Sequence, residues 1–222
     1  MVSADNEVFR PVTVAVMGTH STGKTTLVNE LAELLRLHRI EVAIVADLGS
    51  HALEAGLPIL ANHTWASTTW IITRGISLEL EAWTRADVIL IDRGVPDALG
   101  YYEAALETRG RAADPQRLKQ LEDLVVAHSQ HYDYILRTIL DPTVPLGREK
   151  PRDTDLDFRA RADRHIGAVL QRLGIGHGTL PSGEHDRALV DAIAFIKGRL
   201  ADPGSELDWG DEQQKRGDIQ AS

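Results

Sequence analysis

The chain has 222 residues, of which 43% are hydrophobic, and its formal net charge is −9. This length and apolar content suffice for one substantial α/β core. The chain contains no cysteine, which excludes disulfides, thiolate metal sites and thiol catalysis. The negative charge argues against nucleic acid as a partner, because binding to a phosphate backbone needs a basic face.

The first residues show no signal-peptide pattern, and no apolar run is long enough to cross a membrane. We therefore predict a cytoplasmic protein without a membrane partner. Residues 202–222 carry six acidic and two basic side chains and are rich in Gly and Gln. This composition predicts a disordered acidic tail after one domain that covers residues 1–201.

Strand-like and helix-like patterns alternate along the chain, which is typical of a parallel sheet covered by helices. Apolar segments predict strands over residues 12–16, 41–46, 87–92, 134–139 and 175–180. Helical spacing predicts helices over residues 24–38, 64–84, 96–108, 115–131, 159–173 and 185–200. A loop with Gly49, Gly56 and Pro58 joins the second strand to the long helix. The fold class predicted is α/β, with a five-stranded parallel sheet between helices.

The first strand leads into a stretch, Gly18 to Thr25, that fits the Walker A pattern G-x-x-x-x-G-K-[ST]. Its glycines let backbone N–H groups point at phosphate oxygens, and the helix that follows favours an anion at its N-terminus. We predict that Lys24 reaches the β- and γ-phosphates of ATP and that Thr25 ligates Mg²⁺. The strand and helix on either side disfavour the alternative of a chance match. The residues expected to contact the nucleotide are Gly18, His20, Ser21, Thr22, Gly23, Lys24, Thr25 and Thr26.

The third strand ends at Asp92, the place of a Walker B carboxylate, where it would hold Mg²⁺ opposite Thr25. The alternative is an Asp that caps the next helix. Arg93 follows instead of the Glu typical of motor-type ATPases, and no Asn-Lys-x-Asp or Leu-Ser-Gly-Gly motif occurs. Residues 97–100 have the GTPase form D-x-x-G, but they lie beyond the strand and we discount them. These exclusions favour a small-molecule kinase.

Three blocks of this chain resemble a family of small P-loop AAA-type ATPases and kinases. They are the phosphate loop, the Asp-Arg-Gly-Val-x-Asp-Ala-x-x-Tyr block at 92–101 and Arg-Asp-Thr-Asp at 152–155. That family is related to the ribosylnicotinamide kinase domain of bacterial NAD regulators and, more distantly, to deoxynucleoside and thymidylate kinases. The resemblance covers most of residues 12–200. It implies the P-loop nucleoside triphosphate hydrolase fold with a mobile lid, and ATP and Mg²⁺ as cofactors.

The resemblance also implies catalytic roles for two residues at strand ends. Asp47, after the second strand, is expected to accept the proton of a substrate hydroxyl. This chain departs from its relatives here, because they commonly have Glu with a nearby Arg, and the alternative for Asp47 is a cap on the next turn. Arg93 is expected to face the acceptor or the transferred phosphate, with a surface salt bridge as its alternative.

Residues 141–158 follow the fourth strand, where such kinases have a lid. Arg148 and Arg152 are expected to bring guanidinium groups to the γ-phosphate as it transfers, and Arg159 is a further candidate. Nearby acidic residues almost neutralise this segment, so a solvated charged loop is the alternative.

The long helix lines the acceptor site in the related kinases, and here it carries Trp65, Trp70, Trp83, Arg74 and Glu79. Trp65, or Trp70 with Arg74, could stack on or clamp a ring-bearing acceptor, although core packing is the favoured alternative for the tryptophans. We predict an ATP- and Mg²⁺-dependent kinase acting on a hydroxyl of a nucleoside-like small molecule. The alternative is a nucleotide-dependent regulatory ATPase without a small acceptor. A polynucleotide 5′-kinase is disfavoured by the charge, and homodimer formation is left open.

Overall fold

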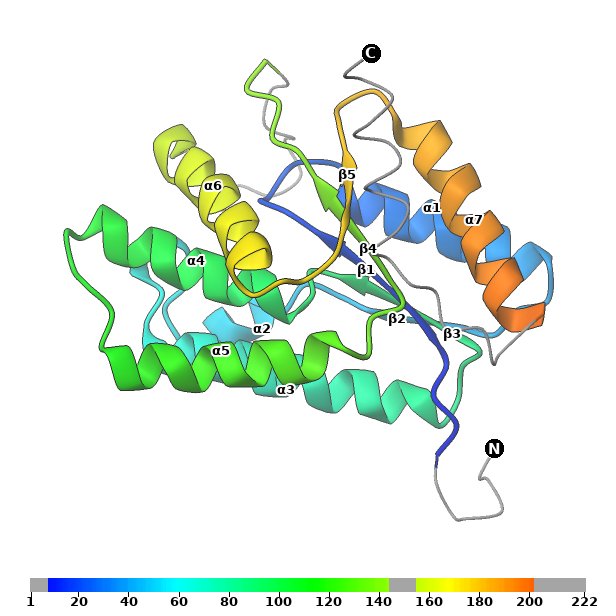
Figure 1. The fold of residues 1–222 in the computed structure, drawn as a ribbon, viewed down its shortest axis with the longest axis horizontal. Coiled ribbons are helices and arrows are strands. Elements are labelled where there is room, and N and C mark those ends of the chain that lie inside the picture. Colours follow the sequence, from blue (N-terminus) through cyan, green and yellow to red (C-terminus); the bar gives the residue numbers. More distant parts are fainter. Residues whose placement is uncertain (1–7, 144–154, 202–222) are drawn as a thin grey trace.

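The computed structural model describes residues 8–143 and 155–201. Five parallel strands form one sheet in the order β2-β3-β1-β4-β5 (Figure 1). They are β1 (Val12–Met17), β2 (Val42–Val45), β3 (Val88–Asp92), β4 (Tyr134–Thr138) and β5 (Gly178–Leu180). The predicted five-stranded parallel α/β sheet is therefore confirmed. The predicted lid residues 144–154 and the predicted tail lie outside the described residues.

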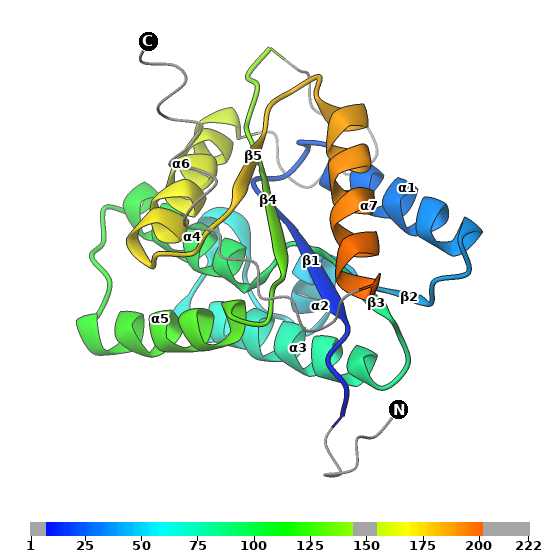
Figure 2. The same cartoon turned by 45° about the vertical axis from the view of Figure 1, so that its right-hand side comes forward.

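Helices cover both faces of this sheet (Figures 1 and 2). One layer consists of α1 (Lys24–Leu37) and α7 (His185–Ala201). The other consists of α3 (Trp65–Trp83), α4 (Val95–Thr108), α5 (Pro115–Ser129) and α6 (Leu156–Arg172). No helix in the two described ranges is both long enough and apolar enough to cross a membrane.

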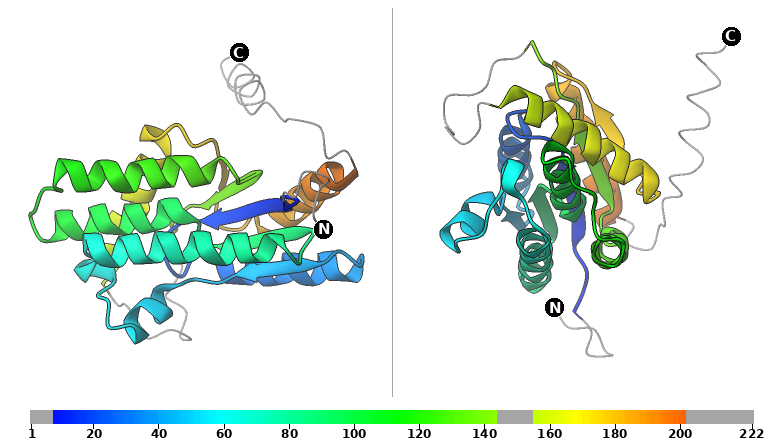
Figure 3. Two further views of the ribbon diagram at one scale, coloured as in Figure 1. Left: turned by 90° about the horizontal axis from the view of Figure 1, so that it is seen from below. Right: turned by 90° about the vertical axis from the view of Figure 1, so that its left-hand side faces the viewer.

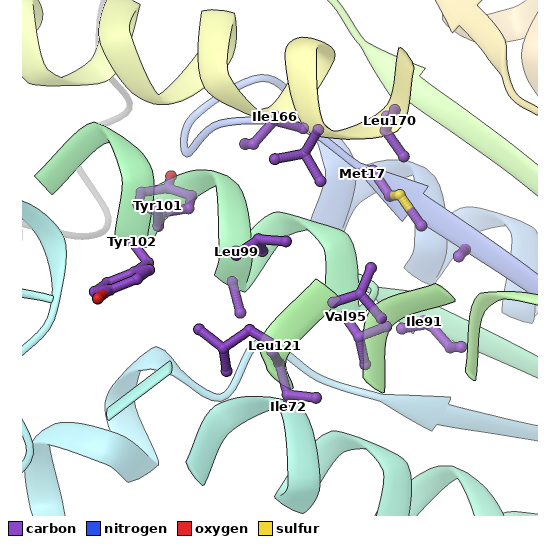
Figure 4. Close-up of a cluster of buried hydrophobic side chains, with 14 of the residues drawn as sticks. Met17, Ile72, Ile91, Val95, Leu99, Tyr101, Tyr102, Leu121, Ile166 and Leu170 are labelled. Carbon is purple, nitrogen blue, oxygen red and sulfur yellow. The ribbon is translucent and has the colours of Figure 1, made fainter. Parts of the chain in front are cut away.

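Side-chain alternation along β1 explains why both faces are covered. Val14 and Val16 belong to the core under α1 and α7, whereas Ala15 and Met17 belong to the core under α3 to α6. All six residues of β1 are buried, as expected for a central parallel strand that packs against helices on both sides. Figure 4 shows part of the core under α3 to α6, which includes Met17, Leu99 and Leu170.

Two short helices, α2 (Gly49–Glu54) and η1 (Leu60–Asn62), occupy the segment predicted as a loop, so that prediction was wrong. Neither helix is long enough to show a repeating apolar face, and α2 lies at the periphery of the fold (Figure 3). Helix α6 begins earlier than predicted because Asp155 caps it, accepting a hydrogen bond of 2.9 Å from Phe158 N. The last strand is shorter than predicted and starts only at Gly178.

The strand order places a crevice at the carboxyl ends of β1 and β3. After β1 the chain continues to β2, which lies at one edge of the sheet. After β3 it crosses to β4, which lies on the opposite side of β1. Open parallel sheets bind ligands where the strand order reverses in this way. Val16 of β1 is in register with Asp92 of β3, so the phosphate loop and the Walker B carboxylate start from neighbouring strand ends.

Helices α4 and α6 pack closely against each other at Gly100. A Cβ atom there would lie 2.6 Å from Ile166 Cγ1 and 2.8 Å from Ile166 Cα, and backbone cannot yield as a flexible side chain can. We expect Gly100→Ala to lower the free energy of unfolding by about 1–3 kcal/mol. Urea unfolding monitored by circular dichroism measures this difference.

The matched control is Gly198→Ala in α7, where no atom lies within 4 Å of the added Cβ. This control should leave stability unchanged or raise it by up to about 1 kcal/mol, because alanine favours helix. Equal effects of the two substitutions would show that the α4–α6 contact at Gly100 is not tight in solution.

Candidate active site

The phosphate loop, residues 18–25, joins β1 to α1 in the backbone shape that its glycines allow. Gly18 has φ +129° and Gly23 has φ +84°, values that residues with side chains rarely adopt. A Cβ on Gly18 would also lie 2.8 Å from Thr138 O in β4. The first glycine of the motif is therefore required both by the turn and by the close approach of β4.

Thr25 and Asp92 meet as the sequence predicts. Thr25 Oγ1 donates a hydrogen bond of 2.5 Å to Asp92 Oδ2. Asp92 Oδ1 is buried and has no hydrogen-bond partner among the described residues. Asp92 does not cap α4, whose N-cap is Gly94 without a side-chain cap. A hydroxyl and a carboxylate oxygen that needs a partner fit Mg²⁺, a hard cation that prefers oxygen ligands.

The remaining Mg²⁺ ligands would have to come from the nucleotide and water. Within the described ranges no group of three or more His, Asp or Glu side chains could hold a metal ion. This agrees with the usual preference of Mg²⁺ for a few protein ligands together with substrate phosphates.

Lys24 lies inside the loop rather than in solvent. Its Nζ donates to Thr19 O and, at 3.3 Å, to Thr22 Oγ1. Burial lowers the pKa of the Lys24 ammonium, whereas Asp97 and Asp92 oppose that shift. A bound triphosphate would favour the charged form further, since opposite charges nearby stabilise it.

Two side chains of α4, Asp97 and Tyr101, contact the phosphate loop, although no role at the nucleotide was predicted for them. Asp97 is buried and accepts hydrogen bonds from Gly18 N at 3.2 Å and 3.0 Å, one to each carboxylate oxygen. Tyr101 Oη accepts a hydrogen bond of 3.0 Å from His20 N and lies 3.2 Å from Thr19 Oγ1. Their spacing of four residues places both on one face of α4, and this spacing was the available signal.

Arg159, predicted as a further γ-phosphate ligand, instead contacts the phosphate-loop backbone from α6. Its Nε donates to His20 O at 3.1 Å and its Nη2 donates to Ser21 O at 2.8 Å. In a trans peptide the N–H points away from the C=O, so these contacts direct the N–H groups of Ser21 and Thr22 to the opposite side. Arg148 and Arg152 lie outside the described residues.

Asp47 and Arg93 meet in the cleft beside the loop. Arg93 Nε lies 3.1 Å from Asp47 Oδ2, and Arg93 Nη1 donates to Gly18 O at 3.1 Å. The Arg93 side chain is only 15% exposed, so its alternative as a surface salt bridge is wrong. Asp47 Oδ1 accepts a hydrogen bond of 2.9 Å from Gly49 N, so the capping alternative is also realised. The Arg that the local sequence around Asp47 lacks is thus supplied by the end of β3.

A cleft of about 880 Å³ extends from the phosphate loop past Asp47 to helix α3. Its walls beyond Asp47 are largely apolar, and the side chains there include Leu48, Ile59, Leu60, Ile71, Val95 and Ala98. No tryptophan is among the described residues that line it. Trp65 lies instead at a separate groove between α3 and α5, with the Arg117 guanidinium 5.3 Å from its ring centre.

Two histidines line the cleft without adding positive charge. Burial, and next the charge of Arg93, lower the pKa of His20 to about 3. Burial lowers the pKa of His63 to about 4, although its hydrogen bond to Leu60 O opposes the shift. Both rings are therefore neutral near pH 7. His20 Nδ1 lies 3.0 Å from Tyr101 Oη, and His63 Nδ1 donates to Leu60 O at 3.0 Å.

The buried carboxylate under the loop should make stability depend on pH. Burial raises the pKa of Asp97 to about 7, although Arg93 opposes this rise. The folded state then binds more protons than the unfolded state between about pH 4 and pH 7, so this group's contribution to stability falls as pH rises through that window.

Asp97→Asn keeps an oxygen acceptor for Gly18 N but removes this titration. We expect the stability of Asp97→Asn relative to wild type to be greater at pH 7 than at pH 5, measured by urea unfolding. Parallel stabilities at the two values would show that Asp97 titrates normally.

Two curated kinases are similar to part of this chain. A cytidylate kinase from Pyrobaculum aerophilum is 31% identical over 120 residues, which cover 50% of this chain and 64% of that protein. A probable thymidylate kinase from Methanopyrus kandleri is 33% identical over 95 residues, which cover 41% of this chain and 46% of that protein. The matches thus span less than two thirds of the length of either relative.

Two solved structures share the fold. NadR protein in complex with NAD and AMP-PNP matches with a TM-score of 0.60 at 17% identity, over 90% of this chain and 51% of NadR. Thymidylate kinase from Ehrlichia chaffeensis matches with a TM-score of 0.56 at 14% identity, over 84% of this chain and 98% of that one. The model of the AAA domain family matches residues 13–188, a span that contains the phosphate loop, Asp92 and α6. The chain therefore belongs to the AAA domain family of P-loop proteins.

Proposed function

We propose that this protein is an ATP- and Mg²⁺-dependent kinase that phosphorylates a hydroxyl of a nucleoside-like small molecule. The observation that carries this proposal is the arrangement around one cleft. The Thr25–Asp92 pair, Lys24 and the Asp47–Arg93 pair all line this cleft, and the Asp47–Arg93 pair lies beside the phosphate loop. The kinase relatives and the shared kinase fold support phosphoryl transfer at a coarser level.

On the donor side, each group has a task that phosphoryl transfer requires. The loop amides and Lys24 would bind the β- and γ-phosphates, while Thr25 and Asp92 would hold Mg²⁺. When bound, Mg²⁺ supplies positive charge that neutralises the phosphate oxygens. Most of the catalysis in such a site comes from positioning and charge stabilisation rather than covalent chemistry.

On the acceptor side, Asp47 would orient the hydroxyl and take its proton as the phosphoryl group transfers. A carboxylate within hydrogen-bond reach of the attacking group is the usual base in kinases. Arg93 would hold Asp47 in place through the ion pair between Arg93 Nε and Asp47 Oδ2. In this proposal Arg148 and Arg152 would complete the charge stabilisation.

The charges in the cleft favour a nucleoside over a nucleotide as acceptor. Lys24 and Arg93 are the only cationic side chains among the described residues that line it. Lys24 lies within the phosphate loop, and Arg93 faces Asp47 at 3.1 Å and Asp97 at 3.9 Å. An acceptor phosphate needs a cation that is not already neutralised. The two curated relatives are named for nucleotides, so the proposal differs from them at this point.

Incubation with labelled ATP, Mg²⁺ and a panel of nucleosides, nicotinamide riboside and nucleoside monophosphates tests the reaction. We expect a phosphorylated nucleoside, and we expect Lys24→Ala to lower the rate by about 100-fold or more. Lys197→Ala, which alters an exposed lysine of α7 beside His38, is the matched control and should retain the activity.

The regulatory ATPase predicts a different result in the same assay. It would release phosphate in a Lys24-dependent way without transfer to any acceptor in the panel. Transfer to nucleoside monophosphates but not to nucleosides would contradict both the charge argument and the hydroxyl acceptor, and it would leave only phosphoryl transfer from ATP in place.

The role of Asp47 is tested by Asp47→Asn, which keeps the shape of the side chain but removes its capacity as a base. We expect kcat to fall by about 100-fold or more, since general base catalysis typically contributes that much. The Kd for ATP, measured by calorimetry, should change by less than about threefold, because Asp47 lies outside the phosphate loop. An unchanged kcat would remove Asp47 from the mechanism.

A further inference from the structure

Three residues of α3 form a stripe along the wall of the cleft. Ile71, Gly75 and Glu79 are spaced four residues apart, so they lie on one face of the helix, and all three line the cleft. A Cβ on Gly75 would meet Leu48 Cδ1 at 3.7 Å and Glu79 Oε1 at 3.9 Å, which are ordinary contacts. Gly75 is thus not required by tight packing, and its missing side chain leaves space in the cleft beside Glu79.

Glu79 is a buried carboxylate whose neighbours both approach it as hydrogen-bond donors. Tyr132 Oη donates to Glu79 Oε1 at 3.2 Å, and it is free to do so because its oxygen already accepts from Val95 N at 3.2 Å. Burial, and next the charge of Glu79, raise the pKa of the Tyr132 phenol, so it keeps its proton. His128 Nε2 lies 2.6 Å from Glu79 Oε2.

These contacts leave Glu79 able to accept more hydrogen bonds. An ionised carboxylate has about four acceptor sites, and two protein groups contact this one. The side chain is 3% exposed, yet it forms part of the cleft wall. A ligand that reaches it is largely removed from water, which strengthens a hydrogen bond to a charge.

We propose that Glu79 recognises the ring end of the acceptor by accepting a hydrogen bond from an N–H group of a heterocycle that lies over Gly75. Leu48 lies next to Gly75, where an added Cβ would be 3.7 Å from Leu48 Cδ1, and Ile71 lies one turn away on the same face of α3. Together with Ala98, which also lines the cleft, these apolar side chains suit the faces of a flat ring. The substrate class is therefore a nucleoside whose ring carries an amide or amino donor. A ring carboxylate at that position is repelled. The inference rests on the proposed function only in placing the acceptor in this cleft.

Binding is measured by calorimetry in the presence of Mg²⁺ and a non-hydrolysable ATP analogue, so that no turnover is needed. The probes are two matched pairs: adenosine with purine riboside, and nicotinamide riboside with nicotinate riboside. For at least one pair we expect wild type to bind the amino or amide member about tenfold more tightly, as for a hydrogen bond to a charged group. Glu79→Gln should reduce that preference to less than about threefold, whereas Glu81→Gln, at an exposed acid of the same helix, should retain it.

The substitution Gly75→Ala tests the position of the ring independently. It should weaken binding of the preferred nucleoside about tenfold by filling the space over the glycine, and thermal denaturation should show an intact fold. Gly198→Ala is the control for the general effect of replacing a helix glycine, and it should leave nucleoside binding unchanged.

The outcomes separate this inference from the proposed function. Preferential binding that depends on Glu79, without turnover in the labelled-ATP assay, supports Glu79 as the recognition group and contradicts the kinase. Turnover with no preference within either pair, or with a preference that Glu79→Gln retains, overturns the role of Glu79 and leaves the kinase in place. Binding of none of the four probes at millimolar concentration also overturns the inference.

Discussion

The candidate site depends on one buried guanidinium. Arg93 lies between Asp47 and Asp97, and it also donates a hydrogen bond to Gly18 O. Its guanidinium therefore connects the proposed acceptor site, the phosphate loop and helix α4. A buried charge is tolerated only when it is paired and hydrogen-bonded, and the same holds for the carboxylates around it. Arg93 has φ +81°, an uncommon value for a residue with a side chain, at the end of β3. Such backbone strain is typical of functional sites, where the surrounding structure holds a side chain in a required position. Here that side chain is the Arg93 guanidinium.

The fold follows from patterns that the sequence displays over long segments. Strands buried on both faces appear as continuous apolar runs, and helices covering them appear as apolar spacing of three and four, so the sheet and the long helices could be predicted. The segment after β2 could not, because a helix of six residues such as α2 shows no repeat. The observed start of α6 differs from the predicted start because the Asp155 cap depends on backbone geometry, which the periodicity of apolar residues does not show.

The site could be predicted where its parts are local. The phosphate loop is contiguous, and Asp92 ends a recognisable strand, so the two motifs predicted that Thr25 and Asp92 meet. Thr25 Oγ1 and Asp92 Oδ2 lie 2.5 Å apart. The role of Asp97 in holding the phosphate loop could not be predicted, because its partner, Gly18 N, is 79 residues away in the chain. Glu79 belongs to the helix that was expected to line the acceptor site, but no role could be assigned to it, because the sequence does not show which face of that helix meets the cleft. The tryptophans were the more conspicuous residues of that helix, yet Trp65 lies at another groove.

The hydrogen bonds from Arg159 to the phosphate-loop backbone affect the free energy of nucleotide binding. Arg159 belongs to α6, which packs against α4 at Gly100, and α4 itself holds the loop through Asp97 and Tyr101. The loop backbone therefore has its shape before a nucleotide arrives. Ordering a flexible loop costs about 1–2 kcal/mol per residue in conformational entropy, and here that loss occurs during folding. Nucleotide binding is then opposed by little further ordering of the chain, as in any preorganised receptor.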